Sequence, residues 1–172
     1  MLGSERGDCF ELIRQGILFI EAKNFSMAKM MFEKSVQISP TAEGLTYLAL
    51  MYSYEKDYTV SIELCKQAIL LDPSYGNPYN DIGTYLVEQQ RLMESIEWFE
   101  KAKNALRYDE RRLPYLNLGR LYIRLSNVDD AKKEYESLLE FEPDNIEAQL
   151  ILGQFVGLSL GKKIQTGIFS SN

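Results

Sequence analysis

The sequence predicts an all-α protein: a right-handed α-solenoid of four helical hairpins followed by a carboxy-terminal capping helix. Two sets of small residues repeat along the chain. The first set recurs every 33 to 36 positions, at Gly16, Ala49, Gly83, Gly119 and Gly153. The second set follows the first four of these by twelve positions, at Ala28, Ser61, Ser95 and Ala131. A near-constant period of this length indicates stacked copies of one supersecondary unit.

The spacing within each unit predicts two antiparallel helices that cross closely. Small residues at the crossing let the helices approach, and bulky residues one turn away fill the space on either side. Turn-forming pairs separate the two helices, at Lys23-Asn24, Lys56-Asp57, Gln90-Arg91 and Ser126-Asn127. A proline ends the second helix of three units, because proline lacks an N–H and restricts the residue before it. Arg107 stands at the equivalent place in the third unit.

The elements follow in order from these signals. Residues 1–7 precede the pattern and are expected to form a flexible amino terminus, and the array is expected over residues 8–160. Its repeats are expected at about 9–41, 42–75, 76–109 and 112–145, with two extra residues near Glu110-Arg111. A half-repeat over residues 146–160 is expected to be the capping helix that such arrays require. Residues 161–172 are expected to be a tail.

The residues around the small positions resemble the signature of the tetratricopeptide-repeat (TPR) family. The fourth unit matches it best, with Tyr115, Leu118, Gly119, Tyr122, Ala131, Tyr135 and Pro143. The first unit supplies Leu12, Gly16, Phe19, Ala28, Phe32 and Pro40. The second supplies Leu45, Leu48, Ala49, Tyr52, Ser61, Cys65, Ala68 and Pro73, and the third supplies Tyr79, Ile82, Gly83, Leu86, Ser95, Phe99 and Ala102. Three departures, at Gln15, Arg107 and Leu138, leave the predicted helix seams intact.

Composition argues against several classes of function. The formal net charge of −6 disfavours binding to phosphate backbones, which depends on clustered Lys and Arg. The chain contains no histidine, which excludes Ser-His and Cys-His catalysis and histidine metal sites. Cys9 and Cys65 are expected to be buried thiols. We therefore expect a protein that is not an enzyme, carries no cofactor or metal, and does not bind nucleic acid.

The distribution of apolar residues bears on location. No stretch approaches the roughly 20 apolar residues needed to cross a bilayer. The apolar stretch over residues 16–20 is too short for a signal-peptide core and lacks a basic region before it. Two isolated cysteines suit a reducing compartment. These features predict a cytoplasmic protein with no membrane partner.

The TPR resemblance implies that the first helices of the repeats line a concave groove that binds a protein or peptide ligand. The candidate peptide-binding residues that it implies are Ile13, Ile17, Tyr47, Leu50, Tyr54, Asn80, Thr84, Asn117, Arg120 and Arg124. We expect an apolar anchor of the ligand near the first two repeats and an acidic group of the ligand near the fourth.

Two parts of this candidate site have more than one interpretation. Ile13 and Ile17 lie on a helix that is apolar almost all round, so they are either core residues or anchors for a ligand. Arg120 and Arg124 are like charges one turn apart, so an acidic group is expected nearby. That group is either Asp81 with Glu88 of the preceding repeat or a carboxylate of the partner.

The function that the resemblance implies is that of a protein–protein interaction module, an adaptor or scaffold. The alternatives are an assembly or secretion chaperone for apolar client segments and a regulatory TPR domain of a larger enzyme. The final helix is too apolar for a free outer face, so residues 162–172 or a second chain are expected to cover it. A homodimer through the terminal helices is one form of such cover.

Overall fold

The computed structural model describes the backbone of residues 2–169 and the side chains of residues 7–157. Within these limits the chain is helical apart from turns, loops and one isolated β-bridge. It divides into two compact units, an amino-terminal unit of Met1–Glu110 and a carboxy-terminal unit of Arg111–Asn172. The predicted all-α fold is confirmed.

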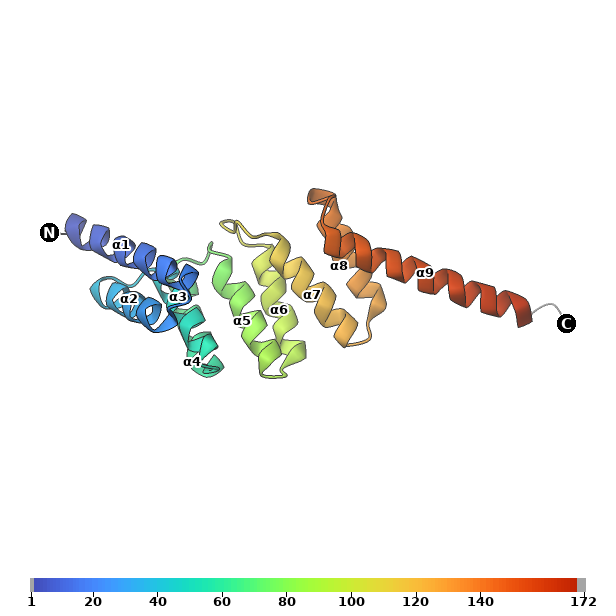
Figure 1. Cartoon of the computed structure of the whole chain (residues 1–172), viewed down its shortest axis with the longest axis horizontal. Coiled ribbons are helices and arrows are strands. Elements are labelled where there is room, and N and C mark those ends of the chain that lie inside the picture. Colours follow the sequence, from blue (N-terminus) through green and yellow to red (C-terminus); the bar gives the residue numbers. More distant parts are fainter. Residues whose placement is uncertain (1, 170–172) are drawn as a thin grey trace. The chain divides into compact units, whose positions relative to one another are not determined.

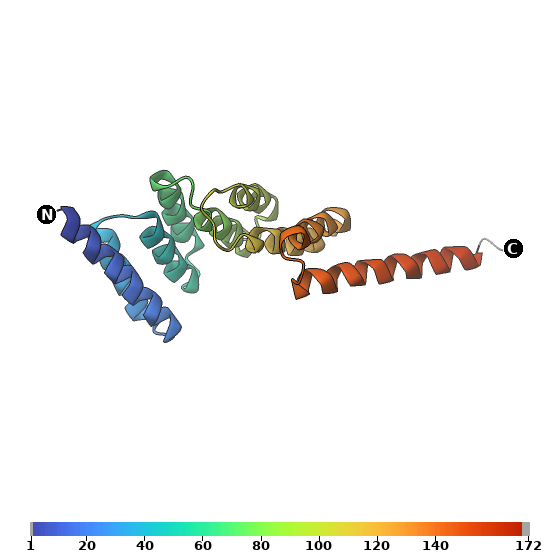
Figure 2. The ribbon, with the colours of Figure 1, turned by 90° about the horizontal axis from the view of Figure 1, so that it is seen from above.

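The amino-terminal unit consists of three helical hairpins (Figure 1). Their helices are α1 (Leu2–Glu21), α2 (Phe25–Ile38), α3 (Ala42–Tyr54), α4 (Tyr58–Leu71), α5 (Asn77–Glu88) and α6 (Leu92–Lys103). The carboxy-terminal unit contains the hairpin of α7 (Arg112–Arg124) and α8 (Val128–Phe141), followed by α9 (Ile146–Phe169), which packs on α8. The two helices of each hairpin lie side by side in both ribbon views (Figure 2).

Close helix crossings occur at the small residues, as the spacing predicts. A methyl group added to Gly83 would lie 2.6 Å from a ring carbon of Phe99, and one added to Gly119 would lie 2.7 Å from a ring carbon of Tyr135. Gly16 faces the ring of Phe32 in the same way. The second set of small residues is fully buried: Ala28, Ser61, Ser95 and Ala131. Each crossing therefore consists of a small residue on one helix and a large ring, or Cys65 in the second hairpin, on the other.

The turn inside each hairpin has a left-handed residue that is not glycine. Lys23, Lys56, Gln90 and Ser126 have φ values of 57°, 64°, 63° and 59°. In three hairpins the next residue caps the second helix, because its side-chain oxygen accepts a hydrogen bond from a backbone N–H of the first turn: Asn24, Asp57 and Asn127. A short side chain at this position satisfies an N–H that the helix itself leaves without a partner.

The segment after α6 folds back onto the connection between α4 and α5. The backbone N–H of Arg107 donates to the carbonyl of Ser74 at 2.9 Å, and the N–H of Gly76 donates to the carbonyl of Arg107 at 2.9 Å. The ring of Tyr108 lies directly against Gly76, where a larger residue would collide with it. Proline could not donate the bond to Ser74. This explains why a residue with an N–H stands where the other repeats have proline.

The Arg107 side chain joins three parts of the amino-terminal unit. Its guanidinium lies 2.6 Å from a carboxylate oxygen of Asp72 at the end of α4 and 2.8 Å from one of Glu43 in α3. Its central carbon lies 4.3 Å from the centre of the Tyr75 ring. Hydrogen bonds from Ser74, and after them the Arg107 guanidinium, hold the pKa of Asp72 below its ordinary value.

The terminal helices extend further than the sequence pattern indicates. Helix α1 begins at Leu2, within the segment expected to be flexible, and α9 continues to Phe169, beyond the expected end at residue 160. No proline interrupts either stretch, so nothing in the backbone stops the helix there. Of the expected tail, residues 170–172 lie outside the described residues. The expected limits of the repeats stay a prediction.

Candidate functional site

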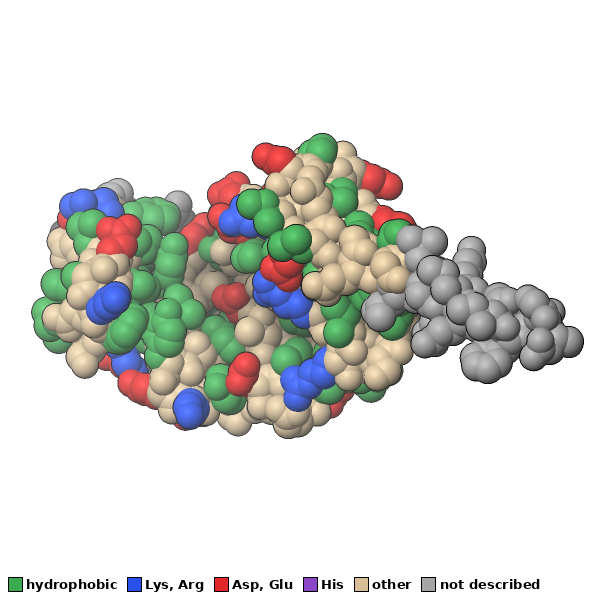
Figure 3. All heavy atoms as spheres, turned by 45° about the vertical axis from the view of Figure 1, so that its right-hand side comes forward, with side chains coloured by type: hydrophobic (Ala, Val, Ile, Leu, Met, Phe, Trp, Pro, Cys, Tyr) green, Lys and Arg blue, Asp and Glu red, His purple; other side chains and the backbone are tan. Residues whose placement is uncertain are grey.

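The first helices of the amino-terminal unit form one layer. Helix α3 contacts both α1 and α5, whereas α2 and α4 pack on the helices before and after them along the chain. We call the surface of α1, α3 and α5 the first-helix face. It includes the candidate residues of the first three repeats. In Figure 3, hydrophobic side chains gather over the amino-terminal hairpins.

The apolar candidates at the amino-terminal end of this face belong to one cluster. Ile13 is buried, so the core interpretation holds for this residue. Ile17, Tyr47 and Leu50 are half-buried and pack against the same cluster. The ring of Tyr47 stacks on Phe32 at a centroid distance of 5.1 Å. These three side chains therefore combine a packing role with surface that a ligand could reach.

Tyr54 lies on α3, at the carboxy-terminal end of the helix that carries Tyr47 and Leu50. Its side chain is 51% exposed and its ring is 4.6 Å from that of Phe25, which is also exposed. Two adjacent exposed rings are an apolar surface of the kind that binds partner side chains. Phe25 was not among the residues expected from the sequence.

In the third repeat the candidate residues are engaged within the chain. Asn80 is buried and donates a hydrogen bond to the carboxylate of Asp81. The exposed Thr84 donates its hydroxyl to the backbone carbonyl of Asn80 at 3.1 Å. The expectation that Asn80 contacts a peptide stays a prediction, and the structure adds that its side chain is buried and bonds to Asp81.

Asp81 is an acidic residue of the first-helix face that was not among the candidate peptide-binding residues. It is half-buried on α5, and burial raises the pKa of its carboxyl group to about 7. Asp81 forms no ion pair with any described residue. A signal was present in the sequence, because positions 77, 78, 84 and 85, one turn away on the same helix, carry no basic residue.

In the fourth repeat Arg120 has a partner that differs from either expectation. Arg120 binds Glu147 of α9 through both of its donor arms, with Nε 2.7 Å from one carboxylate oxygen. The acidic partner is therefore neither Asp81 nor a ligand, because α9 supplies it from within the same unit. Arg124 is exposed in the last turn of α7, and Asn117 is half-buried on the same helix.

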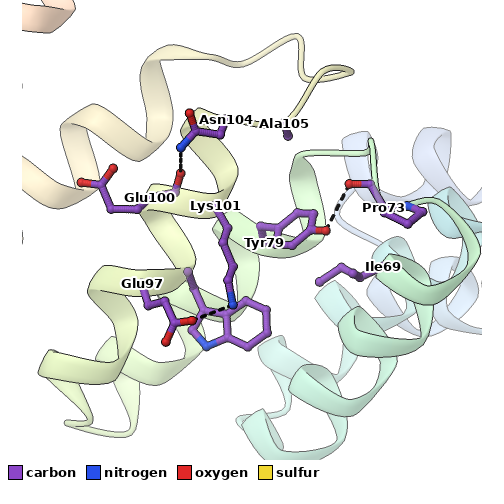
Figure 4. A pocket seen from close by; sticks show the side chains of 9 residues that line it. Ile69, Pro73, Tyr79, Glu97, Glu100, Lys101, Asn104 and Ala105 are labelled. Atoms are coloured by element: carbon purple, nitrogen blue, oxygen red, sulfur yellow. Dashed lines mark hydrogen bonds and ion pairs between the residues drawn. The ribbon is translucent and has the colours of Figure 1, made fainter.

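A second candidate surface lies on the amino-terminal unit between α4 and α6 (Figure 4). It is a hollow of about 590 Å³ whose lining includes Ile69, Pro73, Tyr79, Trp98, Lys101 and Ala105. The ammonium group of Lys101 lies 4.5 Å from the centre of a Trp98 ring and 2.8 Å from a carboxylate oxygen of Glu97. Trp98 was not among the candidate site residues expected from the sequence.

The acidic and thiol side chains of the described residues form no metal-binding cluster and expose no thiol. No cluster of three metal-ligating side chains occurs among them. Both cysteines are buried, and burial raises the pKa of the Cys65 thiol. Within the same residues, no helix is long and apolar enough to cross a membrane.

Comparison with known proteins supports the repeat assignment. The tetratricopeptide-repeat profile matches residues 42–75 and 114–145, which are the expected second and fourth repeats. The type IV pilus assembly protein PilF of Pseudomonas aeruginosa is 26% identical over 128 residues, covering 74% of this chain and 51% of that protein. A Giardia intestinalis UDP-N-acetylglucosamine–peptide N-acetylglucosaminyltransferase is 24% identical over 126 residues, covering 72% of this chain and 8% of the enzyme.

Solved structures agree on the fold. The structure of Pseudomonas aeruginosa PilF has a TM-score of 0.83 at 21% identity, covering 92% of this chain and 72% of that one. The structure of PilW, a type IV pilus biogenesis factor, has a TM-score of 0.73 at 19% identity, covering 85% and 70%. The chain spans about half the length of the curated PilF. Repeats of this kind build extended surfaces for protein–protein interaction. The chain therefore contains tetratricopeptide repeats at residues 42–75 and 114–145.

Proposed function

We propose that this protein is an adaptor that holds a peptide or helix of a partner protein on its first-helix face. One observation carries the proposal: exposed and half-buried aromatic side chains, Tyr47 and Tyr54, lie on this face of the amino-terminal unit. Interfaces are enriched in aromatic residues and gain specificity from a few polar groups.

The residues proposed to contact the ligand follow from their exposure. Tyr54 and Phe25 of α2 offer two adjacent exposed rings, and Ile17, Tyr47 and Leu50 add half-buried apolar surface on α1 and α3. Ile13 supports them from within the core. Arg120 contributes less than its charge suggests, because a ligand carboxylate has to displace Glu147. Asn117 and Arg124 remain secondary contacts in this proposal.

The resemblance to PilF and PilW favours a role as an assembly factor. Both proteins are named for the building of type IV pili, and both share the fold of this chain. We propose that this chain likewise binds a component of a larger structure while that structure forms. A cytoplasmic location, expected from the two reduced thiols, is part of the same proposal.

A second candidate is a regulatory repeat domain of a larger enzyme. The observation that favours it is the match to part of the Giardia transferase, of which the similar segment is a small fraction. In that case the first-helix face would bind a substrate protein or another domain of the enzyme. Either way the surface, and not catalysis by the described residues, carries the function.

Selection from a phage library of random dodecapeptides tests the first-helix face. The wild-type protein, Tyr54→Glu and Leu70→Glu are compared, since both substitutions place a carboxylate on an exposed apolar residue of one hairpin, and Leu70 is 82% exposed on α4. We expect Tyr54→Glu to abolish enrichment and Leu70→Glu to leave it unchanged. Equal enrichment by the wild type and Tyr54→Glu contradicts the proposal.

A further inference from the structure

The hollow between α4 and α6 is lined by two aromatic side chains. Tyr79 of α5 and Trp98 of α6 contribute to its lining, and the centres of their rings lie 6.3 Å apart. Both side chains are half-buried, so each ring packs on the chain and still presents surface to the hollow. The volume of about 590 Å³ lies within the range of roughly 300 to 1,000 Å³ that is typical of ligand sites. The hollow is therefore large enough to hold a side chain of a partner.

A cation of the chain itself lies on one of these rings. The ammonium group of Lys101 is 4.5 Å from the centre of a Trp98 ring. Figure 4 shows the Lys101 side chain extending from α6 toward Glu97, whose carboxylate it binds at 2.8 Å. An aromatic face beside a carboxylate is a favourable environment for a positive charge. The hollow therefore presents a cation site, and Lys101 contacts both of its parts.

Lys101 is held weakly at this site. Its side chain is 45% exposed, and that of Glu97 is 72% exposed. Exposed ion pairs one turn apart on a helix contribute little to stability, because water screens the charges and both side chains lose conformational freedom. The lysine side chain can therefore leave the Trp98 ring for solvent at a small cost, and a better cation can replace it.

The charges around the hollow favour a positively charged ligand. Two carboxylates, Glu97 and Glu100, belong to its lining, and among the described lining residues Lys101 alone is basic. Displacement of Lys101 leaves Glu97 without this ion pair, and Glu100 stands one turn further along the same helix. A guanidinium group stacks flat on an indole ring and presents several donors to carboxylates, whereas an ammonium group is a compact point charge. Arginine therefore fits the site better than lysine does.

We propose that this hollow is a second binding site, which takes an arginine side chain of a partner protein, and that Lys101 competes with that arginine for Trp98. The arginine stacks on the Trp98 ring and binds the carboxylate of Glu97. Ile69 and Ala105 line the same hollow and supply apolar surface for a neighbouring apolar residue of the partner. Most of the lining belongs to α4, α6 and the residues that follow these helices, so the site is separate from the first-helix face and does not rest on the function proposed above.

The fluorescence of Trp98 reports on this site directly, because the chain has a single tryptophan. The probes are three acetylated and amidated tripeptides, Leu-Arg-Leu, Leu-citrulline-Leu and Leu-Glu-Leu, where citrulline keeps the shape of arginine without its charge. At constant ionic strength we expect the arginine peptide to change the fluorescence saturably and to bind at least tenfold more tightly than the other two. Tyr54→Glu should give the same result as the wild type, because Tyr54 lies on α3 and outside the hollow.

The effect of removing Lys101 distinguishes a competitor from a residue that binds the ligand. Lys101→Ala should strengthen binding of the arginine peptide at least threefold, because the competing cation is gone. Lys132→Ala is the matched control, since Lys132 forms the same kind of exposed ion pair with Glu136 on α8, and it should change the affinity less than twofold. Within the Lys101→Ala protein, Glu97→Gln should weaken the arginine peptide at least threefold.

Four results would overturn the proposal. Preference for the glutamate peptide, or weaker binding of the arginine peptide by Lys101→Ala, would show that Lys101 attracts an acidic ligand. The absence of a saturable change with the arginine peptide would show that the hollow binds no arginine. Loss of the signal in Tyr54→Glu would place the peptide on the first-helix face. Because the phage selection tests that face by itself, failure of the arginine site leaves the proposed function standing.

Discussion

Replacing Arg107 by proline should destabilise the amino-terminal unit, although proline is the residue that the TPR signature has at this place. Substitutions towards a family consensus commonly stabilise a protein. Here the structure predicts the opposite sign. The N–H of Arg107 donates to the carbonyl of Ser74, and the guanidinium binds Asp72 and Glu43 while lying over Tyr75.

The magnitude follows from these contacts. Arg107→Ala removes two partly exposed ion pairs, each about 0.2 to 1 kcal/mol, and a cation–π contact of about 0.5 to 1 kcal/mol. We expect it to lower the free energy of unfolding by about 1 to 3 kcal/mol. Arg107→Pro also removes the backbone hydrogen bond, about 1 kcal/mol net and more if the Ser74 carbonyl stays buried. We expect a loss of about 2 to 4 kcal/mol for proline.

Urea denaturation of the wild type and both variants, followed by circular dichroism, measures these differences. The ion pairs should weaken in 1 M salt, so the alanine variant should then approach the wild type, whereas the proline variant should not. Because the folded-state pKa of Asp72 is lowered, its contribution is present at neutral pH and is lost as the pH falls through that pKa. A proline variant as stable as the wild type would show that the β-bridge contributes nothing.

Three further results are expected. Asp81→Asn should stabilise the protein by about 1 to 2 kcal/mol at pH 8 and little at pH 4. The reason is that an aspartate with a raised folded-state pKa costs stability as the pH rises from its ordinary pKa to about 7. Thermal melts at both pH values check the sign. Gly119→Leu should lower Tm by overpacking against Tyr135, at a cost of about 1 to 3 kcal/mol. Its control Gly153→Leu should not, because no described atom lies within 4 Å of a methyl group there. Leu150→Lys changes an exposed apolar residue of α9. If a second chain covers α9, light scattering should give a smaller mass for this variant than for the wild type. Equal masses would exclude this cover.

The fold could be predicted because its determinants are local and repeated. Each crossing needs one small residue and one large residue or ring at a constant spacing, as at Gly83 with Phe99 and Gly119 with Tyr135. A signal that recurs along one chain is hard to produce by chance. Helix caps such as Asn24 are also set by local sequence. The left-handed residues before these caps are not glycines, so their backbone conformation could not be predicted from residue type.

The site was predicted less well, because its determinants are long-range pairings. Arg107 meets Asp72 across 35 positions, and Arg120 meets Glu147 across 27. No periodicity links such residues, so the sequence alone left Arg120 with two other expected partners. Ile13 illustrates the same limit, because an apolar residue on an apolar helix has no sequence signal that separates core from contact.

Arg107 and Asp81 differ in how the amino-terminal unit compensates their charges: Arg107 forms two ion pairs, and Asp81 forms none with a described residue. Arg107 ties α3, the end of α4 and the loop before α5 together, which fixes the frame on which α5 is held. Asp81 stands on that same helix without a cation and so costs stability at neutral pH.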